Sequence, residues 1–176
     1  MLKKIVVIGP ESTGKSTLSQ QLAEHYQTAW VPEYAREYLL RNGMQYSFED
    51  LLTIAKGQLA VEDKLVLEAK KDLLFIDTNM YVMKVWCEFV FGKCHQWILD
   101  RIVDRDYDLY LLCNIDLPWV KDELREYPDV NSRLALYNIY KDAMINQEVP
   151  WREIIGNYAE RLQSAVRAVD DCISLN

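Results

Sequence analysis

Two hydrophobic patterns alternate along the chain, and the first consists of short apolar runs. Residues 3–9 (KKIVVIG), 72–78 (DLLFIDT) and 108–115 (DLYLLCNI) are nearly unbroken in this way, which is typical of strands buried on both faces of a sheet. The apolar residues of the first run are all β-branched, which favours a strand over a helix. Two shorter strands are predicted at residues 28–31 and 151–155.

The second pattern is helical, and it fills the stretches between the strands. Leu18, Leu22 and Ala23 lie on one face of the first such stretch. Ser47 is followed three residues later by Asp50, a spacing typical of a helix start. Helices are predicted at residues 15–26, 34–42, 47–71, 80–91, 95–105 and 158–173, with one more after the charged stretch 121–133. Strands that alternate with helices predict an α/β fold, in which a parallel sheet carries helices on both faces.

Composition narrows the class of protein. The chain has 176 residues, which suits a single domain spanning residues 1–176. It contains no apolar run of about 18 residues, so no membrane span is predicted. Its formal charge is 20 − 27 = −7 and it lacks a basic cluster, so nucleic acid is not an expected partner. The oligomeric state is left open, and a homo-oligomer is compatible with the sequence.

The cysteines do not indicate a metal site. Cys87, Cys94, Cys113 and Cys172 form no CxxC pair, and His25 and His95 are the only histidines beside them. Reduced thiols in a cytoplasmic protein are therefore expected.

A phosphate-binding motif follows the first strand. Residues 9–16 (GPESTGKS) fit G-x-x-x-x-G-K-[ST] at every fixed position, between an apolar strand and an amphipathic helix. Backbone N–H groups of such a loop surround the β-phosphate of a nucleoside triphosphate, and the helix N-terminus adds partial positive charge. Lys15 would bridge the β- and γ-phosphates, Ser16 would ligate Mg²⁺, and Thr17 would reach the α-phosphate. The expected ATP-binding residues are Gly9, Glu11, Ser12, Thr13, Gly14, Lys15, Ser16 and Thr17.

A carboxylate ends the third predicted strand. Enzymes with such a loop need an acid at the tip of a neighbouring strand, which holds Mg²⁺ directly or through water. Asp77 stands at that point in LLFID, although a strand-end aspartate can also cap the helix that follows it. Asp116, after the fourth strand, is the spare candidate.

The segment after the second strand offers an acceptor side. Carboxyl ends of parallel strands line the ligand crevice, which would bring Glu33 and Arg36 beside the transferred phosphate. Glu33 would orient or deprotonate an acceptor hydroxyl group, and Arg36 would neutralise charge. Trp30 and Tyr34 offer flat faces for an aromatic base. The alternative is that the charges are solvated and the aromatic rings belong to the core.

A charged stretch after the fourth strand is the candidate lid. Arginines in a mobile lid over the phosphates would stabilise the transferring charge. Arg125 and Arg133 are eight residues apart, about two helical turns, so one helix would direct both alike unless Tyr127-Pro128 interrupts it. A solvated charged helix is the alternative.

Four segments in this order resemble the kinase domain of NadR-type proteins. They are GPESTGKSTL, PEYARE, FIDT and DLPWVKDELR with a later arginine, and together they cover nearly the whole chain. Those proteins are ATP-dependent nicotinamide riboside kinases of the P-loop AAA-like family. The resemblance implies a P-loop kinase fold with a five-stranded parallel sheet and a helical lid near residues 116–140. It also implies transfer of the ATP γ-phosphate to the ribose 5′-hydroxyl group, which gives nicotinamide mononucleotide in NAD salvage.

Residue roles carry over from this resemblance by position. Asp77 matches the family's strand-end acid, and Glu33, Tyr34 and Arg36 match its acceptor segment, while Asp122 and Arg125 match the approach to its lid. One departure is visible. A tryptophan directly precedes the glutamate in the family, where it is available to stack on nicotinamide, whereas here Pro32 holds that place and Trp30 lies three residues before Glu33. The stacking role of Trp30, and with it the nucleoside, stays open.

Other functions remain to be separated from this one. The multifunctional members of the family carry an adenylyltransferase domain and a DNA-binding segment, and because this sequence begins at its phosphate-loop strand, neither is expected here. A kinase for another nucleoside or nucleotide is the first rival. An ATPase switch that moves a partner, or a nucleotide-binding regulator without chemistry, is a rival from another class.

Overall fold

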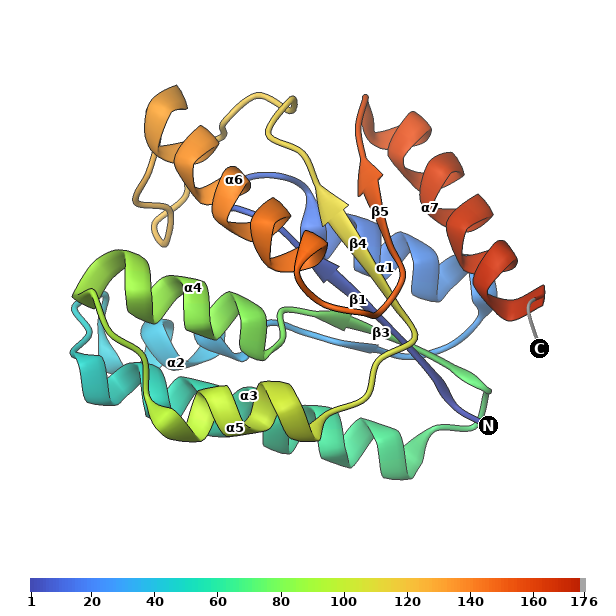
Figure 1. Ribbon diagram of the computed structural model, residues 1–176, viewed down its shortest axis with the longest axis horizontal. Helices are drawn as coiled ribbons and strands as arrows, with labels where there is room; N and C mark the ends of the chain where they lie inside the picture. The colour runs from blue at the N-terminus through green and yellow to red at the C-terminus, as the bar shows by residue number, and fades with distance from the viewer. Residues whose placement is uncertain (175–176) are drawn as a thin grey trace.

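Parallel strands form one sheet. The computed structural model describes residues 1–174, within which the strands are β1 (Lys3–Ile8), β2 (Trp30–Val31), β3 (Leu73–Asp77), β4 (Leu109–Cys113) and β5 (Trp151–Ile154). Their order in the sheet is β2-β3-β1-β4-β5, and each neighbouring pair runs parallel (Figure 1). The predicted α/β fold is confirmed, because each strand lies in one of the apolar runs.

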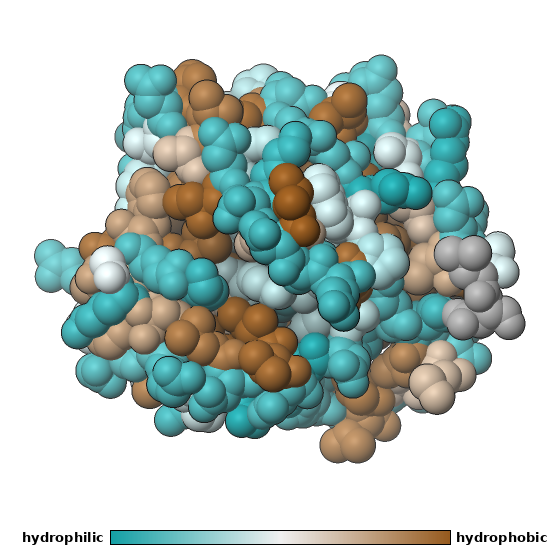
Figure 2. All heavy atoms as spheres, in the orientation of Figure 1, coloured by the Kyte–Doolittle hydropathy of each residue, from teal (hydrophilic) through white to brown (hydrophobic). Residues whose placement is uncertain are grey.

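Helices cover both faces of this sheet. They are α1 (Lys15–Tyr26), α2 (Tyr34–Asn42), α3 (Phe48–Glu68), α4 (Met80–Phe91), α5 (Gln96–Asp104), α6 (Val130–Ile145) and α7 (Tyr158–Ser174). Helix α3 begins as the sequence indicated, with a capping box in which the side chains of Ser47 and Asp50 bond to each other's backbone N–H groups. Figure 2 shows the hydrophobic residues of one face as separate patches among hydrophilic ones, as expected of helices that turn polar sides to solvent.

The pleat of β1 explains why its sequence shows no alternation. Ile5 and Val7 pack into a cluster with α1 and α7, which lie on the same side of the sheet in Figure 1. Val6 and Ile8 point the other way, into a cluster with α6. A third cluster lies away from the sheet and joins α2, α3, α4 and α5. Residues 5–8 are fully buried. Because both faces of the strand are shielded from water, every one of these positions is apolar.

The strand order creates one ligand crevice. The chain leaves β1 toward β2 on one side of the sheet and leaves the neighbouring β3 toward β4 on the other, so connections diverge in opposite directions between β1 and β3. Loops that follow the strands therefore meet at this edge. They carry the phosphate loop, Glu33, Asn114 and Gly156, and Asp77 is the last residue of its strand there.

The segment between β4 and α6 decides whether Arg125 and Arg133 lie on one helix. Residues 114–129 contain turns but no regular helix, and α6 begins only at Val130, where the Asp129 side chain accepts a hydrogen bond from the Ser132 N–H group. Pro128 lies just before this cap, where the sequence indicated an interruption. Arg125 therefore lies in the loop and Arg133 on α6, and the two do not share a helix.

A glycine inside α3 makes room for α2. A Cβ atom at Gly57 would collide with the ring of Tyr34, at the first turn of α2. The ring can lie against α3 only because this position has no side chain. The close approach fixes the start of α2, and with it the position of Glu33 one residue earlier.

We expect Gly57→Ala to destabilise the protein by about 1–3 kcal/mol, because the new methyl group displaces the Tyr34 ring. At an unconstrained helix position the same change stabilises by up to about 1 kcal/mol. A double-mutant cycle by urea denaturation separates these effects. In a Tyr34→Ala background, Gly57→Ala is expected to be stabilising, and the same loss in both backgrounds would contradict the packing explanation.

Candidate active site

The phosphate loop has the backbone of an anion site. It links β1 to α1 through Gly9, Ser12 and Gly14, whose φ angles are 139°, 57° and 79°. The Gly14 N-cap makes no side-chain hydrogen bond, so the first N–H groups of α1 are left for a ligand. Lys15 Nζ and Thr13 Oγ1 both donate to the Pro10 carbonyl oxygen at 2.8 Å, which keeps the lysine folded over the loop.

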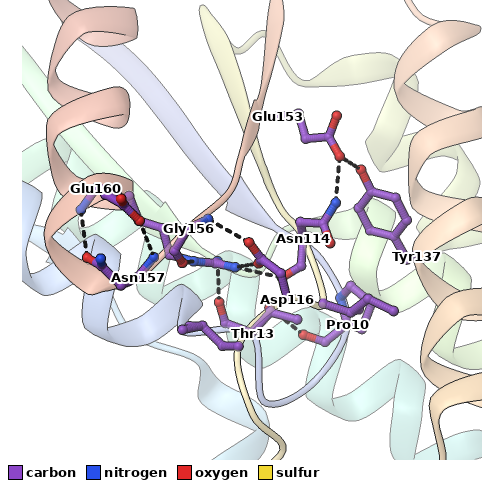
Figure 3. A network of polar contacts seen from close by, with 12 residues as sticks. Pro10, Thr13, Asn114, Asp116, Tyr137, Glu153, Gly156, Asn157 and Glu160 are labelled. Atoms are coloured by element: carbon purple, nitrogen blue, oxygen red, sulfur yellow. Dashed lines mark hydrogen bonds and ion pairs between the residues drawn. The ribbon is translucent and has the colours of Figure 1, made fainter.

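A buried arginine supports this loop from α7. Arg161 is 2% exposed and donates to the carbonyl oxygens of Thr13 at 2.8 Å, Asn114 at 2.9 Å and Gly156 at 2.7 Å. Figure 3 shows these acceptors gathered from the phosphate loop and from the loops after β4 and β5. Sequence reasoning missed Arg161, whose only signal is a cation within the apolar pattern of the last helix.

The same network removes Asp116 as a metal candidate. Its carboxylate accepts hydrogen bonds from the Gly156 N–H group at 2.6 Å and from the Arg161 guanidinium group (Figure 3). The carboxylate is therefore committed to joining two loops. Asp77 is left as the strand-end acid of the site.

Asp77 is a buried carboxylate without a geometric hydrogen-bond partner. The residue is 0% exposed, and neither Oδ1 nor Oδ2 is paired within the described residues. Burial first, and then the charge of Glu33, raise its pKa to about 7, although the Lys15 ammonium and Ser16 hydroxyl groups favour the charged form. An orphaned carboxylate beside a hydroxyl group fits a divalent cation.

Magnesium could not be held here by protein carboxylates alone. Within the described residues no group of three or more His, Cys, Asp or Glu side chains surrounds a metal position. Ser16 and Asp77 offer oxygen ligands, and the remaining ligands must come from water and phosphate oxygens. This division is typical of Mg²⁺ bound together with a nucleotide.

The cleft runs from the phosphate loop to an aromatic end. Its cavity measures about 270 Å³, and its walls include all of residues 9–17. Glu33 and Arg36 line the same cavity. Its walls also contain the apolar and aromatic residues Leu39, Met44, Tyr46, Val82, Val85, Trp86, Phe89, Val90, Leu124, Tyr127, Leu136 and Tyr140.

The aromatic residues expected to face the ligand lie elsewhere. Trp30 packs against the apolar cluster of α1 and α7, on the other face of the sheet from Val31. Tyr34 packs against α3 beside Gly57. Neither residue lines the cleft, because the pleat of β2 and the entry of α2 turn both rings away.

Other aromatic residues line the cleft, and sequence reasoning missed them. Trp86 and Phe89 are three residues apart on α4 and both line the cleft. Trp86 Nε1 donates to the Tyr46 hydroxyl group at 2.9 Å, and the two rings meet edge to face with centroids 4.9 Å apart. The spacing on α4 was a signal, but nothing in the sequence indicated that this face of α4 meets Tyr46.

The expected acceptor and lid residues are brought together in part. Arg36 Nη1 and Nη2 donate to both carboxylate oxygens of Asp122 at 3.2 and 2.8 Å, and this hydrogen bonding holds the pKa of Asp122 below its usual range. Arg125 lines the cleft and donates to the Val120 carbonyl oxygen at 2.5 Å. Arg133 is 5% exposed, donates to the carbonyl oxygens of Ile115 and Leu117, and does not line the cleft.

Glu11 ties the loop before α6 to the phosphate loop. Its carboxylate accepts hydrogen bonds from the backbone N–H groups of Glu126 at 2.9 Å and Tyr127 at 2.6 Å, and from Trp119 Nε1 at 3.4 Å. Ser12 Oγ also accepts from the Val120 N–H group at 2.9 Å. Residues 119–127, in the loop before α6, are thus hydrogen-bonded to the phosphate loop itself.

Residues 4–161 match a family model described as an AAA domain. The chain is 31% identical over 142 residues to the "Trifunctional NAD biosynthesis/regulator protein NadR" of Salmonella typhimurium, and 31% identical over 144 residues to the protein of that name from Escherichia coli. Each match covers 78% of this chain and 34% of the relative, so the chain spans about a third of the length of these relatives.

Solved structures with the same fold include two of NadR. One is of NadR protein in complex with NR, with a TM-score of 0.80, 22% identity, and coverage of 97% of this chain and 49% of that one. The other, in complex with NAD and AMP-PNP, has a TM-score of 0.75, 21% identity and coverage of 99% and 50%. Thymidylate kinase from Ehrlichia chaffeensis follows at 0.66, with 14% identity and coverage of 96% and 98%. None of the helices described here combines the length and hydrophobicity that crossing a membrane requires.

We expect Asp77→Asn to stabilise the protein at pH 8 by on the order of 2–4 kcal/mol and to change its stability little at pH 4. The pKa of Asp77 rises from 3.8 to about 7 on folding, so the folded state binds this proton more tightly than the unfolded state. Wild-type stability is therefore full below about pH 4 and falls as the pH rises through about 7. Urea denaturation across this range measures the difference.

The neutral amide of Asp77→Asn does not titrate, so this contribution to the pH dependence of stability is absent. The difference in the free energy of unfolding between variant and wild type should therefore widen as the pH rises. Asp106→Asn, at an exposed position before β4, is the matched control and should show no such widening. A constant gap at every pH would contradict the assignment of a burial penalty to Asp77.

We expect Glu11→Ala to speed tryptic cleavage after Arg125 about tenfold or more, because hydrogen bonds to a charged acceptor contribute roughly 1.5–3 kcal/mol each. Limited proteolysis without nucleotide measures the rate. Glu123→Ala is the control, since Glu123 lies in the same segment and makes none of these bonds. Equal cleavage rates for Glu11→Ala and the control would show that the carboxylate does not hold the segment.

Proposed function

The chain belongs to the AAA domain family, and we propose that it is an ATP-dependent kinase for nicotinamide riboside. In this proposal residues 1–176 act as one cytoplasmic kinase domain that transfers the γ-phosphate of ATP to the ribose 5′-hydroxyl group and yields nicotinamide mononucleotide. Homology to NadR over 78% of the chain supports a role connected with NAD. The shared fold with NadR structures that hold NR and AMP-PNP supports this pair of ligands.

The donor half of the cleft would hold ATP by its phosphates. Backbone N–H groups from Glu11 to Ser16 would surround the β-phosphate, Lys15 would contact the β- and γ-phosphates, and Thr17 the α-phosphate. Ser16 would ligate Mg²⁺, and Asp77 would hold it directly or through water. The ion, when bound, neutralises charge that develops on the β- and γ-phosphate oxygens.

Glu33 is the proposed group at the acceptor hydroxyl. It lines the cleft and lies close enough to Asp77 for its charge to raise the pKa of that carboxyl group, so a ribose bound beside the phosphates would reach it. The hydroxyl oxygen forms a bond to the γ-phosphorus as its proton passes to Glu33, and the bond from phosphorus to the bridging oxygen breaks to release ADP. Arg36 and Arg125 stand at the same cleft and would offset charge on the transferring group.

One observation carries the choice of a cationic base. The aromatic end of the cleft is lined by Glu123 and Glu126 as well as by aromatic rings, and Glu126 accepts a hydrogen bond from Tyr46 at 2.8 Å. The nicotinamide ring of the riboside is a pyridinium cation, which both aromatic faces and carboxylates attract. A neutral pyrimidine or purine gains nothing from this charge. Trp86, Tyr46 and Tyr127 therefore replace Trp30 and Tyr34 as the proposed stacking residues.

A second candidate is a nucleotide kinase, which would phosphorylate a nucleoside monophosphate. The two arginines at the cleft, Arg36 and Arg125, would bind its phosphate, and thymidylate kinase shares the fold. Arg36 is already neutralised by Asp122, however, which leaves less positive charge for a second phosphate.

The test of the proposal is a phosphoryl-transfer assay with Mg·ATP and a panel of nicotinamide riboside, uridine, thymidine and thymidine monophosphate. We expect product with nicotinamide riboside, and a loss of kcat of about 10²–10⁴-fold in Glu33→Gln if that carboxylate takes the proton. Product with another acceptor alone would replace the substrate and keep the kinase. ATP hydrolysis without any acceptor would instead support the ATPase switch.

Trp86→Leu tests the acceptor end separately. Stacking of a base on an aromatic side chain contributes roughly 1–3 kcal/mol, so KM for the nucleoside should rise about 5–150-fold while KM for ATP changes little. Trp97→Leu is the matched control, because Trp97 lies on α5 and does not line the cleft. An unchanged nucleoside KM in Trp86→Leu would exclude this ring from the base site.

A further inference from the structure

Gln58 is a fully buried amide whose bonds all go to the backbone around the cleft. It lies on α3 and is 1% exposed. Its Oε1 accepts a hydrogen bond from the Tyr34 N–H group at 2.7 Å. Its Nε2 donates to the carbonyl oxygens of Pro32 at 3.2 Å and Asp77 at 3.4 Å. One side chain thus contacts the residues on both sides of Glu33 and the backbone of Asp77 itself.

The two hydrogen bonds donated by Gln58 Nε2 lie where the pairing of β2 with β3 ends. Trp30 pairs with Phe75 and Val31 with Ile76, so Pro32 and Asp77 would form the next pair of this parallel ladder. Proline has no N–H group, so the ladder cannot continue there. The Gln58 amide group replaces it, since it bridges the two carbonyl oxygens from a third element.

The remaining bond holds the beginning of α2. Glu33 is the N-cap residue of α2, and its own side chain makes no capping hydrogen bond. Gln58 Oε1 instead accepts from the first N–H group of the helix, that of Tyr34. The helix start is thus held without the Glu33 carboxylate, which lines the cleft.

We infer that Gln58 is a positioning residue that fixes the spacing between the carboxylates of Glu33 and Asp77. The inference rests on the proposed function, in which one carboxylate serves the acceptor hydroxyl and the other serves Mg²⁺. Two like charges at such a site repel each other, and only rigid backbone holds them at a set separation. A displacement of about 1 Å at such a site costs on the order of 10²-fold in rate.

Glu62 provides a matched control on the same helix. It lies one turn further along α3 and is 0% exposed, so it is buried like Gln58. Its partners belong to the opposite end of the sheet: Tyr107 donates to Glu62 Oε2 at 3.1 Å, and Lys4 and Arg105 lie 3.8 Å from Oε1. Substitution of Glu62 disturbs a buried polar group of α3 without touching the cleft.

The first measurement compares Gln58→Met with Glu62→Met in the phosphoryl-transfer assay. Methionine keeps the length of glutamine and removes its hydrogen bonds, so Gln58→Met should lower kcat about 10–100-fold and change either KM less than about threefold. Glu62→Met should lower thermal stability and leave kcat near that of the wild type. Equal kcat losses in both variants would overturn the inference and indicate general destabilisation.

The second measurement needs no acceptor and so separates this inference from the proposed function. Calorimetry gives the ratio of ATP dissociation constants without and with Mg²⁺, which reports how well Asp77 is placed for the ion. We expect this ratio to fall about fivefold or more in Gln58→Met and to stay unchanged in Glu62→Met. An unchanged ratio in Gln58→Met would overturn the inference even if nicotinamide riboside is the substrate.

If Gln58→Met does not fold, Gln58→Glu replaces it. Glutamate keeps the acceptor for the Tyr34 N–H group, and so the start of α2, but removes the donor to Asp77. The ratio of dissociation constants should fall in this variant too, and its retention would contradict the role of the Nε2 donor.

Discussion

The burial of the Asp77 carboxylate is the constraint around which the cleft is built. A carboxylate cut off from water is unfavourable as an anion, and the charge of Glu33 adds to the difficulty. The strand that carries Asp77 is held in place by packing, since β3 is buried at every position. Such a group is stabilised once a cation shares its oxygens, so the geometry that is unfavourable for folding is suited to binding.

Short-range patterns account for what the sequence could predict. The strands, the helices and the phosphate loop depend on apolar spacing, β-branched residues and a motif whose residues are consecutive, all of which are visible in one dimension. The face of the sheet to which each β2 side chain points was not visible in the sequence. Trp30 and Val31 are neighbours, but the pleat sends them to opposite faces, and the sequence does not say which face the cleft occupies. The aromatic residues expected at the ligand therefore belong to a segment whose rings do not line the cleft.

Long-range contacts account for what was missed. Gln58 contacts Asp77, 19 positions away, and Arg161 contacts Thr13, 148 positions away, and both bonds go to backbone carbonyl oxygens, which every residue possesses. Such acceptors leave no mark in a sequence. Gly57 was the one hint in the sequence that α3 packs closely against another element, because a glycine within a long helix usually has a packing reason. The position of Arg133 was not visible for a related reason, since its guanidinium group donates to the carbonyl oxygens of Ile115 and Leu117 and not into the cleft.

The two halves of the cleft differ in how much they say about the reaction. The donor half consists of backbone N–H groups, a lysine and a hydroxyl group, which suit any nucleoside triphosphate and recur wherever this fold binds one. Discrimination must come from the other half, where α4 and the loop before α6 meet. There Glu123 and Glu126 stand beside aromatic rings. Both carboxylates are exposed, and their negative charge would favour a cationic base over an anionic one, as the proposed acceptor requires.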